Sequence, residues 1–158
     1  MKDKVQVHLK TYTVEDTQQF GQILGKWVQQ NGDPLCIALI GDLGTGKTHL
    51  SQGIAKGFGV TEEITSPTFA IMNTYDVNRT HLYHFDVYRI GDIEEMDEIG
   101  YEDYFYGEGV CLIEWADLIR EILPEQMCRV TIEKDLEKGF DYRKITLEGF
   151  KGIEEQEA

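Results

Sequence analysis

Positive charge is scarce in this chain of 158 residues. Lysine and arginine together number 15 against 29 aspartates and glutamates, giving a formal net charge of −14. Nucleic acids are held through their phosphates by clustered lysine and arginine, so we expect no nucleic acid to bind this chain unaided. A well-solvated surface is the simplest explanation of the acidity, and docking on a basic partner is the functional alternative.

Cysteines and long apolar runs are also few. Cys36, Cys111 and Cys128 lie in apolar stretches and form no C-x-x-C pair, so we expect buried, reduced thiols. The longest apolar run, LCIALI at 35–40, is far shorter than the roughly 20 residues that span a membrane. Residues 1–10 lack the continuous apolar segment of a signal peptide. These features predict a cytoplasmic protein without membrane contact.

Alternating strand and helix signals predict one α/β domain over residues 1–150. Strands are expected where apolar residues alternate or run continuously, and helices where they recur at helical spacing after a cap such as Thr13. The expected strands are 5–10, 35–40, 69–75, 81–88, 110–115, 128–134 and 143–149, the last two as an antiparallel pair. The expected helices run from 13 to about 30, from 47 to about 56 where Gly57 and Gly59 end it, and before Pro124. Residues 151–158 are expected to form a flexible acidic tail.

The segment 91–108, called the acidic segment below, holds eight acidic residues and no lysine or arginine. It also carries apolar and aromatic side chains, which disordered acidic tails usually lack. We therefore expect a short helix and loop packed on the body of the domain, with a face left for a partner.

The sequence GDLGTGKT at residues 41–48, called the phosphate loop below, fits the pattern G-x-x-x-x-G-K-[ST]. In this pattern backbone N–H groups wrap the phosphates of a nucleotide, here from about Leu43 to Thr48. Lys47 is expected to reach the β- and γ-phosphates, and the Thr48 hydroxyl to bind Mg²⁺. A buried strand before the loop and a helix after it make a chance glycine-rich turn a weak alternative. The predicted nucleotide-binding residues in the loop are Gly41, Asp42, Leu43, Gly44, Thr45, Gly46, Lys47 and Thr48.

ATP is the favoured nucleotide, because the chain lacks the N-K-x-D sequence with which G-proteins read guanine. For the adenine, the sequence suggests only the region of Tyr12 and Thr13.

Two carboxylates close predicted strands. Asp86 ends LYHFD and Glu114 ends VCLIE. Either carboxylate is suited to hold Mg²⁺ through water, to orient the attacking water or to accept its proton. The structural alternatives are a turn residue for Asp86 and a helix cap for Glu114. His81 and His84 lie three apart on a strand and so face opposite sides, which argues against a shared metal and favours core or surface roles.

The order of GDLGTGKT, ITSPTFAI, HLYHFDVYRI and LIEWAD resembles the TsaE family of small ATPases in bacterial tRNA threonylcarbamoyladenosine (t6A) biosynthesis. The resemblance covers residues 12–148. It implies a P-loop NTPase-like domain whose central, mostly parallel sheet is flanked by helices on both sides. It further implies slow hydrolysis of ATP with Mg²⁺, needed for turnover of a complex that modifies adenosine 37 of tRNAs reading codons that start with A. The implied partners are a sugar-kinase-like threonylcarbamoyl transferase subunit and its paralogue.

The resemblance also assigns residues. Thr48 and Glu114 match the magnesium positions of the family, Asp86 matches its other functional acid, and Trp115 matches the tryptophan beside the acid. Ser66, Pro67 and Thr68 match a switch-like segment near the γ-phosphate. A rigid loop with two hydroxyls suits that role, although a local turn explains the same residues.

Two other functions stay open from the residues alone. A small-molecule or nucleotide kinase of the P-loop class usually has an arginine-rich lid. This chain has only five arginines and no arginine-rich loop. The third possibility is a binding module that holds nucleotide without turnover.

Overall fold

The structure is a computed structural model, and it describes residues 6–31, 35–42, 44–65, 71–78 and 80–150. Within them, one sheet of seven strands has the order β1-β7-β6-β2-β5-β4-β3. The strands are β1 (Gln6–Thr11), β2 (Leu35–Ile40), β3 (Met72–Val77), β4 (Thr80–Asp86), β5 (Val110–Glu114), β6 (Cys128–Lys134) and β7 (Arg143–Glu148).

The middle of the sheet is parallel and its margins are antiparallel. β2 lies between β6 and β5, and β5 pairs with β4, all in parallel. The margins are β3 against β4 at one side and β7 against β6 and β1 at the other. β2 is apolar along its whole length, and β5 is apolar up to its last residue, Glu114; both strands have helices on their two faces, whereas β1 alternates between exposed and covered positions. The predicted strands and the antiparallel β6–β7 pair are confirmed.

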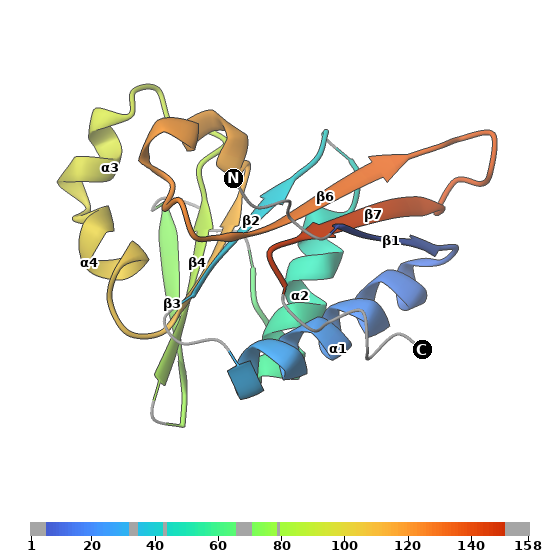
Figure 1. The fold of residues 1–158 in the computed structure, drawn as a ribbon, viewed down its shortest axis with the longest axis horizontal. Helices are drawn as coiled ribbons and strands as arrows, with labels where there is room; N and C mark the ends of the chain where they lie inside the picture. The colour runs from blue at the N-terminus through green and yellow to red at the C-terminus, as the bar shows by residue number, and fades with distance from the viewer. Residues whose placement is uncertain (1–5, 32–34, 43, 66–70, 79, 151–158) are drawn as a thin grey trace.

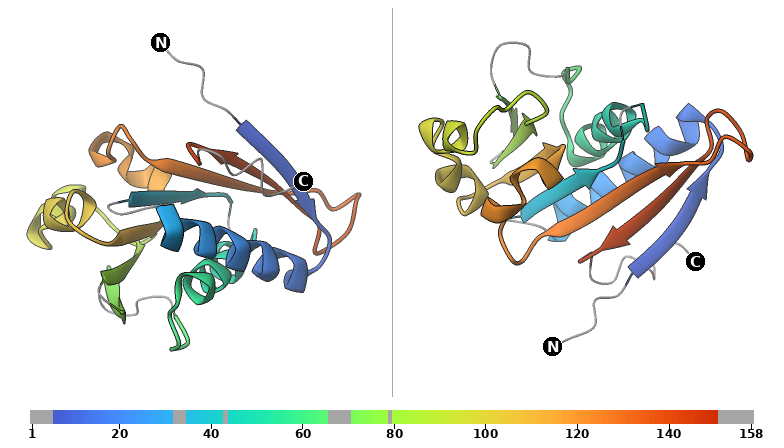
Figure 2. Two further views of the ribbon diagram at one scale, coloured as in Figure 1. Left: turned by 60° about the horizontal axis from the view of Figure 1, so that its bottom comes forward. Right: turned by 90° about the horizontal axis from the view of Figure 1, so that it is seen from above.

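Helices lie on both faces of the sheet, as Figures 1 and 2 show. One face carries α1 (Val14–Asn31) and α2 (Lys47–Phe58). The other carries α3 (Glu94–Glu98), α4 (Tyr101–Phe105) and the 3-10 helix η1 (Ala116–Ile122). The predicted α/β architecture with flanking helices is therefore confirmed, and so are short helices in the acidic segment.

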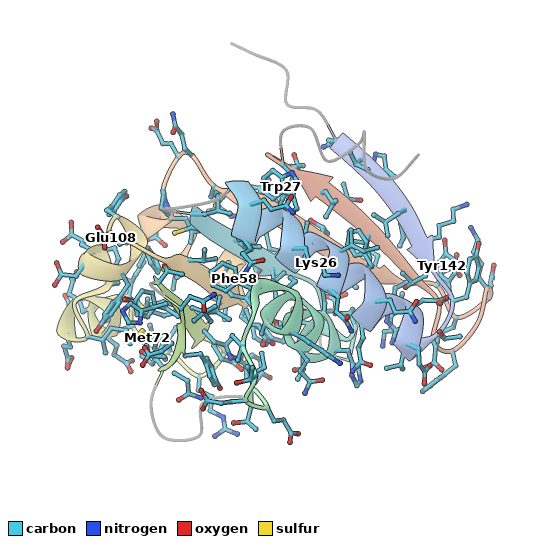
Figure 3. All side chains as sticks on the ribbon, turned by 90° about the horizontal axis from the view of Figure 1, so that it is seen from below. Lys26, Trp27, Phe58, Met72, Glu108 and Tyr142 are labelled. Carbon is cyan, nitrogen blue, oxygen red and sulfur yellow. The ribbon has the colours of Figure 1, made fainter. Side chains whose placement is uncertain are left out.

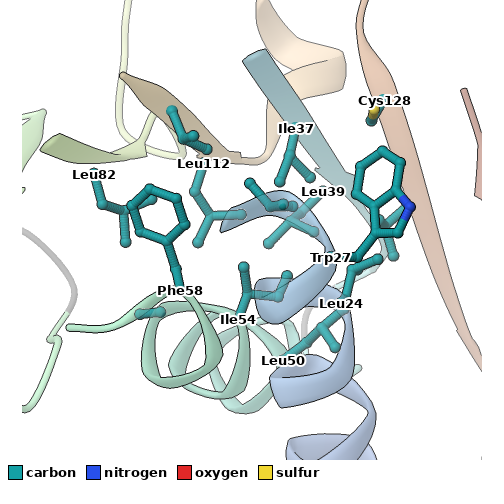
Figure 4. Packing of buried hydrophobic residues seen from close by; sticks show 14 of the residues in the cluster. Leu24, Trp27, Ile37, Leu39, Leu50, Ile54, Phe58, Leu82, Leu112 and Cys128 are labelled. Carbon is teal, nitrogen blue, oxygen red and sulfur yellow. The ribbon is translucent and has the colours of Figure 1, made fainter. Parts of the chain in front are cut away.

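The larger core lies between the sheet and the α1–α2 pair. In Figure 4, Leu24 of α1 and Ile54 of α2 point toward Ile37 and Leu39 of β2 and Leu112 of β5. All five side chains are fully buried. The large apolar area removed from water here holds α2 against the sheet, and with it the phosphate loop from which α2 begins.

Four glycines allow α1 and α2 to cross closely. They are Gly21 and Gly25 on α1 and Gly53 and Gly57 on α2, and a Cβ at any of them would overlap backbone atoms of the other helix. The prediction that Gly57 helps to end α2 was wrong, because α2 continues to Phe58 and Gly59 caps it at φ 120°. Gly57 serves helix packing instead, since its missing Cβ makes room for the carbonyl oxygen of Gln22.

The structure tests some of the smaller sequence-based predictions and leaves others untested. The three cysteines are buried and free, as predicted. No helix of the described residues has the length and apolar character to cross a membrane. The tail at 151–158, Leu43 and the switch-like residues Ser66, Pro67 and Thr68 lie outside the described residues. The domain limits at 1–150 stay a prediction.

Candidate functional site

The phosphate loop connects the end of β2 to the first residue of α2. Gly44 and Gly46 adopt left-handed backbone conformations, with φ of 80° and 93°, which a side chain would strain. Gly41 lies so close to β6 that a Cβ would be 2.7 Å from the carbonyl oxygen of Ile132. Among the residues that the structure describes, no side chain caps the N-terminus of α2. Its first N–H groups are therefore available to an anion, as the glycine pattern predicts.

Lys47 folds back onto its own loop. Its ammonium group donates hydrogen bonds to the carbonyl oxygens of Gly41 (2.5 Å) and Asp42 (2.9 Å) and lies 3.8 Å from the ring centroid of Trp115. The residue is only 5% exposed. Burial lowers the pKa of Lys47, and the negative charge of Glu114 opposes that shift most strongly. The lysine thus lies in the electrostatic field of the predicted carboxylates.

Asp86 and Glu114 are directly opposite one another on adjacent parallel strands, β4 and β5. Each is the last residue of its strand. The same alternating positions of these strands, Leu82 and Leu112, pack in the core beneath α1 and α2. Both carboxylates therefore lie on the α2 side of the sheet, at the carboxyl ends of its parallel strands, where open α/β sheets bind ligands.

The two carboxylates have different surroundings. Asp86 is partly buried, and its Oδ1 accepts a hydrogen bond from the backbone N–H of Tyr88 (3.1 Å). Burial raises the pKa of Asp86 above its usual value, and the hydrogen bond from Tyr88 opposes the rise. Glu114 is 2% exposed and its Oε2 accepts from the Ser51 hydroxyl of α2 at 3.2 Å. A carboxylate this deeply buried needs such donors.

A histidine also contacts Glu114. The His84 Nε2 lies 2.6 Å from the same Oε2, and both side chains are buried. The prediction that His81 and His84 face opposite sides is confirmed, since exposed His81 instead contacts Asp76. Sequence reasoning missed the contact of His84 with an acid. Its spacing from Asp86 was the available signal, because residues two apart on a strand share a face.

Trp115 follows Glu114 in a left-handed conformation, with φ 62° and ψ 34°. Non-glycine residues rarely adopt this conformation. It places the indole between the Lys47 ammonium group and the ring of Tyr88, whose centroid is 4.6 Å from that of Trp115. The tryptophan predicted from its position beside the acid thus contacts the key lysine of the phosphate loop.

Arg143 of β7 reaches the outside of the phosphate loop. Its Nε donates to the carbonyl oxygen of Thr45 (2.6 Å), and its Nη2 to that of Gly44 (3.4 Å). Sequence reasoning gave Arg143 no role, because the contact joins residues 98 positions apart. The guanidinium thus ties two carbonyl groups of the phosphate loop to β7.

The region of Tyr12 and Thr13 lies beside Tyr142, the residue before β7. The ring of Tyr12 packs edge-on against Tyr142, with centroids 5.5 Å apart, and Tyr142 precedes Arg143 in the chain. Tyr12 is 61% exposed. Thr13 caps α1 as predicted, with its Oγ1 accepting from the N–H of Asp16 (3.0 Å). The geometry thus gives Thr13 a capping role, and its contact with adenine stays a prediction.

The residues present suit a magnesium ion that the protein holds through few ligands. Within the described part of the chain, no group of three or more His, Cys, Asp or Glu side chains forms a complete metal site. The exposed Thr48 and the two strand-end carboxylates are hard oxygen donors. Such partial sets suit Mg²⁺, which keeps several waters and takes further ligands from bound phosphates.

Most predicted site residues are thus brought together around the start of α2. Asp42, Gly44, Thr45, Gly46, Lys47 and Thr48 belong to the loop, and Asp86, Glu114 and Trp115 lie beside it. Arg89 is exposed and joins no ion pair in the described residues.

The fold is a mixed α/β fold with one seven-stranded sheet, mostly parallel in its middle and flanked by helices, and a glycine-rich loop joins β2 to α2. A family model described as threonylcarbamoyl adenosine biosynthesis protein TsaE matches residues 11–145. The chain belongs to the TsaE family, as its sequence motifs indicated.

Individual relatives agree with this assignment. The tRNA threonylcarbamoyladenosine biosynthesis protein TsaE of Bacillus subtilis (strain 168) is 40% identical over 141 residues, covering 89% of this chain and 84% of that protein. The protein of the same name from a Synechocystis species is 42% identical over 114 residues, with coverage of 70% and 69%. Among solved structures, Bacillus subtilis YdiB superposes with a TM-score of 0.71 at 33% identity, covering 99% of this chain and 93% of that one.

Proposed function

We propose that this chain is an ATPase subunit that binds ATP with Mg²⁺ and hydrolyses it slowly to ADP and phosphate. The observation that carries the proposal is the placement of Asp86 and Glu114 as register partners at strand ends, on the sheet face that carries α2 and the phosphate loop. A loop that binds phosphates supplies binding alone. A loop with two carboxylates beside it also has groups that can organise water and metal for hydrolysis.

The residues divide the work as follows. The N–H groups of the loop and of the first turn of α2 bind the phosphates, and Lys47 leaves its carbonyl partners to pair with them. Thr48 and Glu114 would hold Mg²⁺, which neutralises charge on the phosphates when bound. Asp86 is the candidate to orient the attacking water or accept its proton. Its raised pKa suits proton transfer better than an ordinary aspartate would.

ATP is proposed over other nucleotides, with its adenine near Tyr12 and Thr13. Support comes from the contact of Tyr12 with Tyr142, because Tyr142 precedes Arg143, the residue of β7 that contacts the loop. The exposed aromatic ring of Tyr12 offers a surface on which a base can stack.

The biological role proposed is in tRNA modification. Bacterial TsaE proteins that are 33–42% identical to this chain are named for threonylcarbamoyladenosine biosynthesis. We propose that ATP use by this subunit is required for threonylcarbamoylation of adenosine 37 in tRNAs reading codons that start with A. The partners would be a sugar-kinase-like transferase subunit and its paralogue in the cytoplasm. With a net charge of −14, this subunit is expected to leave tRNA binding to them.

The test follows the γ-phosphate. ATP labelled at the γ-position is incubated with the chain, alone and with the two partners, and the label is traced. Release as inorganic phosphate supports the ATPase, transfer to a metabolite supports the kinase alternative, and binding without either supports a binding module. A turnover of 10 s⁻¹ or more for the isolated chain, on the order of a typical committed enzyme, would contradict slow hydrolysis.

Two variants tie the result to the site. Glu114→Gln keeps the shape and removes the charge, so it should bind ATP yet lose most hydrolysis. Lys47→Ala should lose nucleotide binding itself, because the loop loses its cation. If Glu114→Gln hydrolyses ATP at the parent rate and with the parent magnesium dependence, the role proposed for Glu114 is wrong.

A further inference from the structure

We propose that His84 is a positioning residue whose Nε2 donates a hydrogen bond that fixes the carboxylate of Glu114 for magnesium. The inference rests on the function proposed above, because it acts through Glu114 as a metal ligand. It adds a residue that neither the motif nor the family match assigns.

The contact is short and enclosed. The His84 Nε2 and Glu114 Oε2 are 2.6 Å apart, and the two residues are 1% and 2% exposed. At 2.6 Å, the contact is at the short end of the range for hydrogen bonds in proteins. Because both partners sit on strands of the central sheet, the backbone holds them in place, and neither has solvent as an alternative partner.

The strand register explains why the imidazole reaches this acid. Asp86 pairs with Glu114, and His84 pairs with Leu112, one step back on the same face. His84 therefore lies diagonally from Glu114 across β4 and β5, within reach of a long side chain. β4 thus places Asp86 directly opposite Glu114 and places His84 diagonally across from Glu114.

Both donors to Glu114 act on one oxygen. The Ser51 hydroxyl, 3.2 Å from Oε2, approaches from α2, and His84 approaches from β4. Two donors from different elements fix the torsion of the carboxylate, so that its other oxygen, Oε1, has a defined direction. Ser51 lies one turn after Lys47 on α2, so the same carboxylate is also linked to the helix that begins at the phosphate loop.

The tautomer follows from the other ring nitrogen. The His84 Nδ1 is buried and has no hydrogen-bond partner in the described part of the chain. A proton on Nδ1 would leave a buried donor unsatisfied and would leave Nε2 without a proton for the carboxylate. A proton on Nε2 provides the donor that the 2.6 Å contact requires.

Removing a partner that orients a metal ligand typically lowers metal affinity by about 10–100-fold. His84→Leu removes the donor and fills the space, so it should raise the magnesium concentration needed for half-maximal tightening of ADP binding by about that factor. His84→Gln keeps an N–H donor near the position of Nε2, and it should stay closer to the parent. ADP affinity without magnesium should be unchanged in both variants, because the phosphate loop is intact.

The experiment measures ADP binding by calorimetry against magnesium concentration for the parent, His84→Leu, His84→Gln, Glu114→Gln and the double variant His84→Leu/Glu114→Gln. If His84 acts through Glu114, adding His84→Leu to Glu114→Gln should change the magnesium response little. A merely structural effect would instead persist in the double variant. Melting temperatures serve as the folding control.

Nitrogen NMR of the unsubstituted protein tests the tautomer without any variant. A ring protonated at Nε2 is expected, and protonation at Nδ1 alone overturns the inference. The inference is also overturned if His84→Leu keeps the normal magnesium response while Glu114→Gln loses that response. The proposed function survives that result. If Glu114→Gln itself keeps the normal response, the magnesium role of Glu114 fails and the inference falls with it.

Discussion

The ammonium group of Lys47 lies over the ring of Trp115, 3.8 Å from its centroid. The contact is a cation–π pair in a partly enclosed place, where such pairs contribute about 0.5–2 kcal/mol. It also occupies the lysine that the proposed function assigns to phosphates. The cation of the loop therefore contacts an aromatic ring and two loop carbonyls, and under the proposed function a nucleotide would replace these contacts.

The first prediction uses this contact as a reporter. ADP binding should change the fluorescence of Trp115, because Lys47 moves from the indole toward the phosphates. The other tryptophan, Trp27, is buried in the core against Phe150, so its emission should stay constant. Titration of the parent with ADP should give a saturable signal, and Trp115→Phe should abolish it while calorimetry still detects binding. A full signal in Trp115→Phe would show that the lysine does not move as proposed.

The second prediction concerns Asp86 and stability. Burial raises the pKa of Asp86 in the folded state above its unfolded value. The folded state then binds the proton more tightly, so this group lowers stability as pH rises from the unfolded pKa through the folded one. Asp86→Asn should therefore melt at a higher temperature than the parent at pH 7, and the difference should shrink as pH falls below about 4, the unfolded value.

The same substitution should slow hydrolysis. Loss of a group that moves a proton typically costs about 10²–10⁴-fold. Thermal melts at pH 4 and pH 7 and phosphate release together check both expectations. A variant that is less stable at neutral pH and fully active would place Asp86 among ordinary turn residues.

Local sequence patterns predicted the helices and strands, but they did not predict contacts between residues that are distant in the sequence. The strand at Ile37, the helix cap at Thr13 and the loop glycines depend on neighbours a few residues away, so the sequence shows them directly. The contact of His84 with Glu114 depends on the register of β4 and β5, and that of Arg143 with Thr45 on the path of β7.

Glycine was the hardest residue to interpret from sequence. Gly57 suggests a helix end because glycine commonly ends helices, but here it is needed inside α2 for the approach of α1. The pair Gly21 and Gly25 on one helix and the pair Gly53 and Gly57 on the other share the same four-residue spacing. That shared spacing is the signal that distinguishes close helix packing from helix termination.

The third prediction tests Arg143 as the outer support of the phosphate loop. Arg143→Ala removes the donors to the carbonyls of Gly44 and Thr45, and such charged hydrogen bonds contribute roughly 1.5–3 kcal/mol. ADP affinity should fall by about tenfold or more, and Arg143→Lys should recover part of it. Arg129→Ala is the matched control, since Arg129 lies at the other end of the antiparallel β6–β7 pair and forms an ion pair with Glu148 at 3.6 Å. Equal losses in both variants would mean a general effect on the hairpin.

The fourth prediction concerns the acidic segment as a partner surface. Glu95 is unsuitable for substitution, because its Oε2 accepts the backbone N–H groups of Gly91 (2.8 Å) and Asp92 (3.1 Å). The exposed side chains of Glu94, Asp97 and Glu98 are better targets. Reversing all three to lysine should weaken assembly with the sugar-kinase-like partners and leave ADP affinity unchanged, because the segment lies away from the hairpin side of the site.

Figure 3 shows this separation, with Glu108 and Tyr142 at opposite ends of the molecule. The matched control reverses three exposed acids outside the segment, Glu121, Glu125 and Glu137. Co-purification of the partners measures assembly. Normal assembly of the Glu94, Asp97 and Glu98 variant would leave the segment as a solvated surface.

The last prediction tests the helix crossing that supports the loop. A Cβ on Gly25 would overlap the carbonyl oxygen of Ile54 and lie 2.7 Å from the backbone nitrogen of Phe58. Backbone atoms cannot rotate away as side chains do, so Gly25→Ala must push α1 and α2 apart. Overpacking of this kind costs about 1–3 kcal/mol, which corresponds to roughly 2–12 °C in melting temperature for a chain of this size.

Gly91→Ala is the control, because its Cβ would meet only the carboxylate end of the Glu95 side chain, at 3.3 Å. Its melting temperature should stay near that of the parent. Since α2 begins at the phosphate loop, Gly25→Ala should also weaken ADP binding, whereas Gly91→Ala should not. A Gly25→Ala protein that melts with the parent would mean that the two helices have room to separate, and the four glycines would then need another explanation.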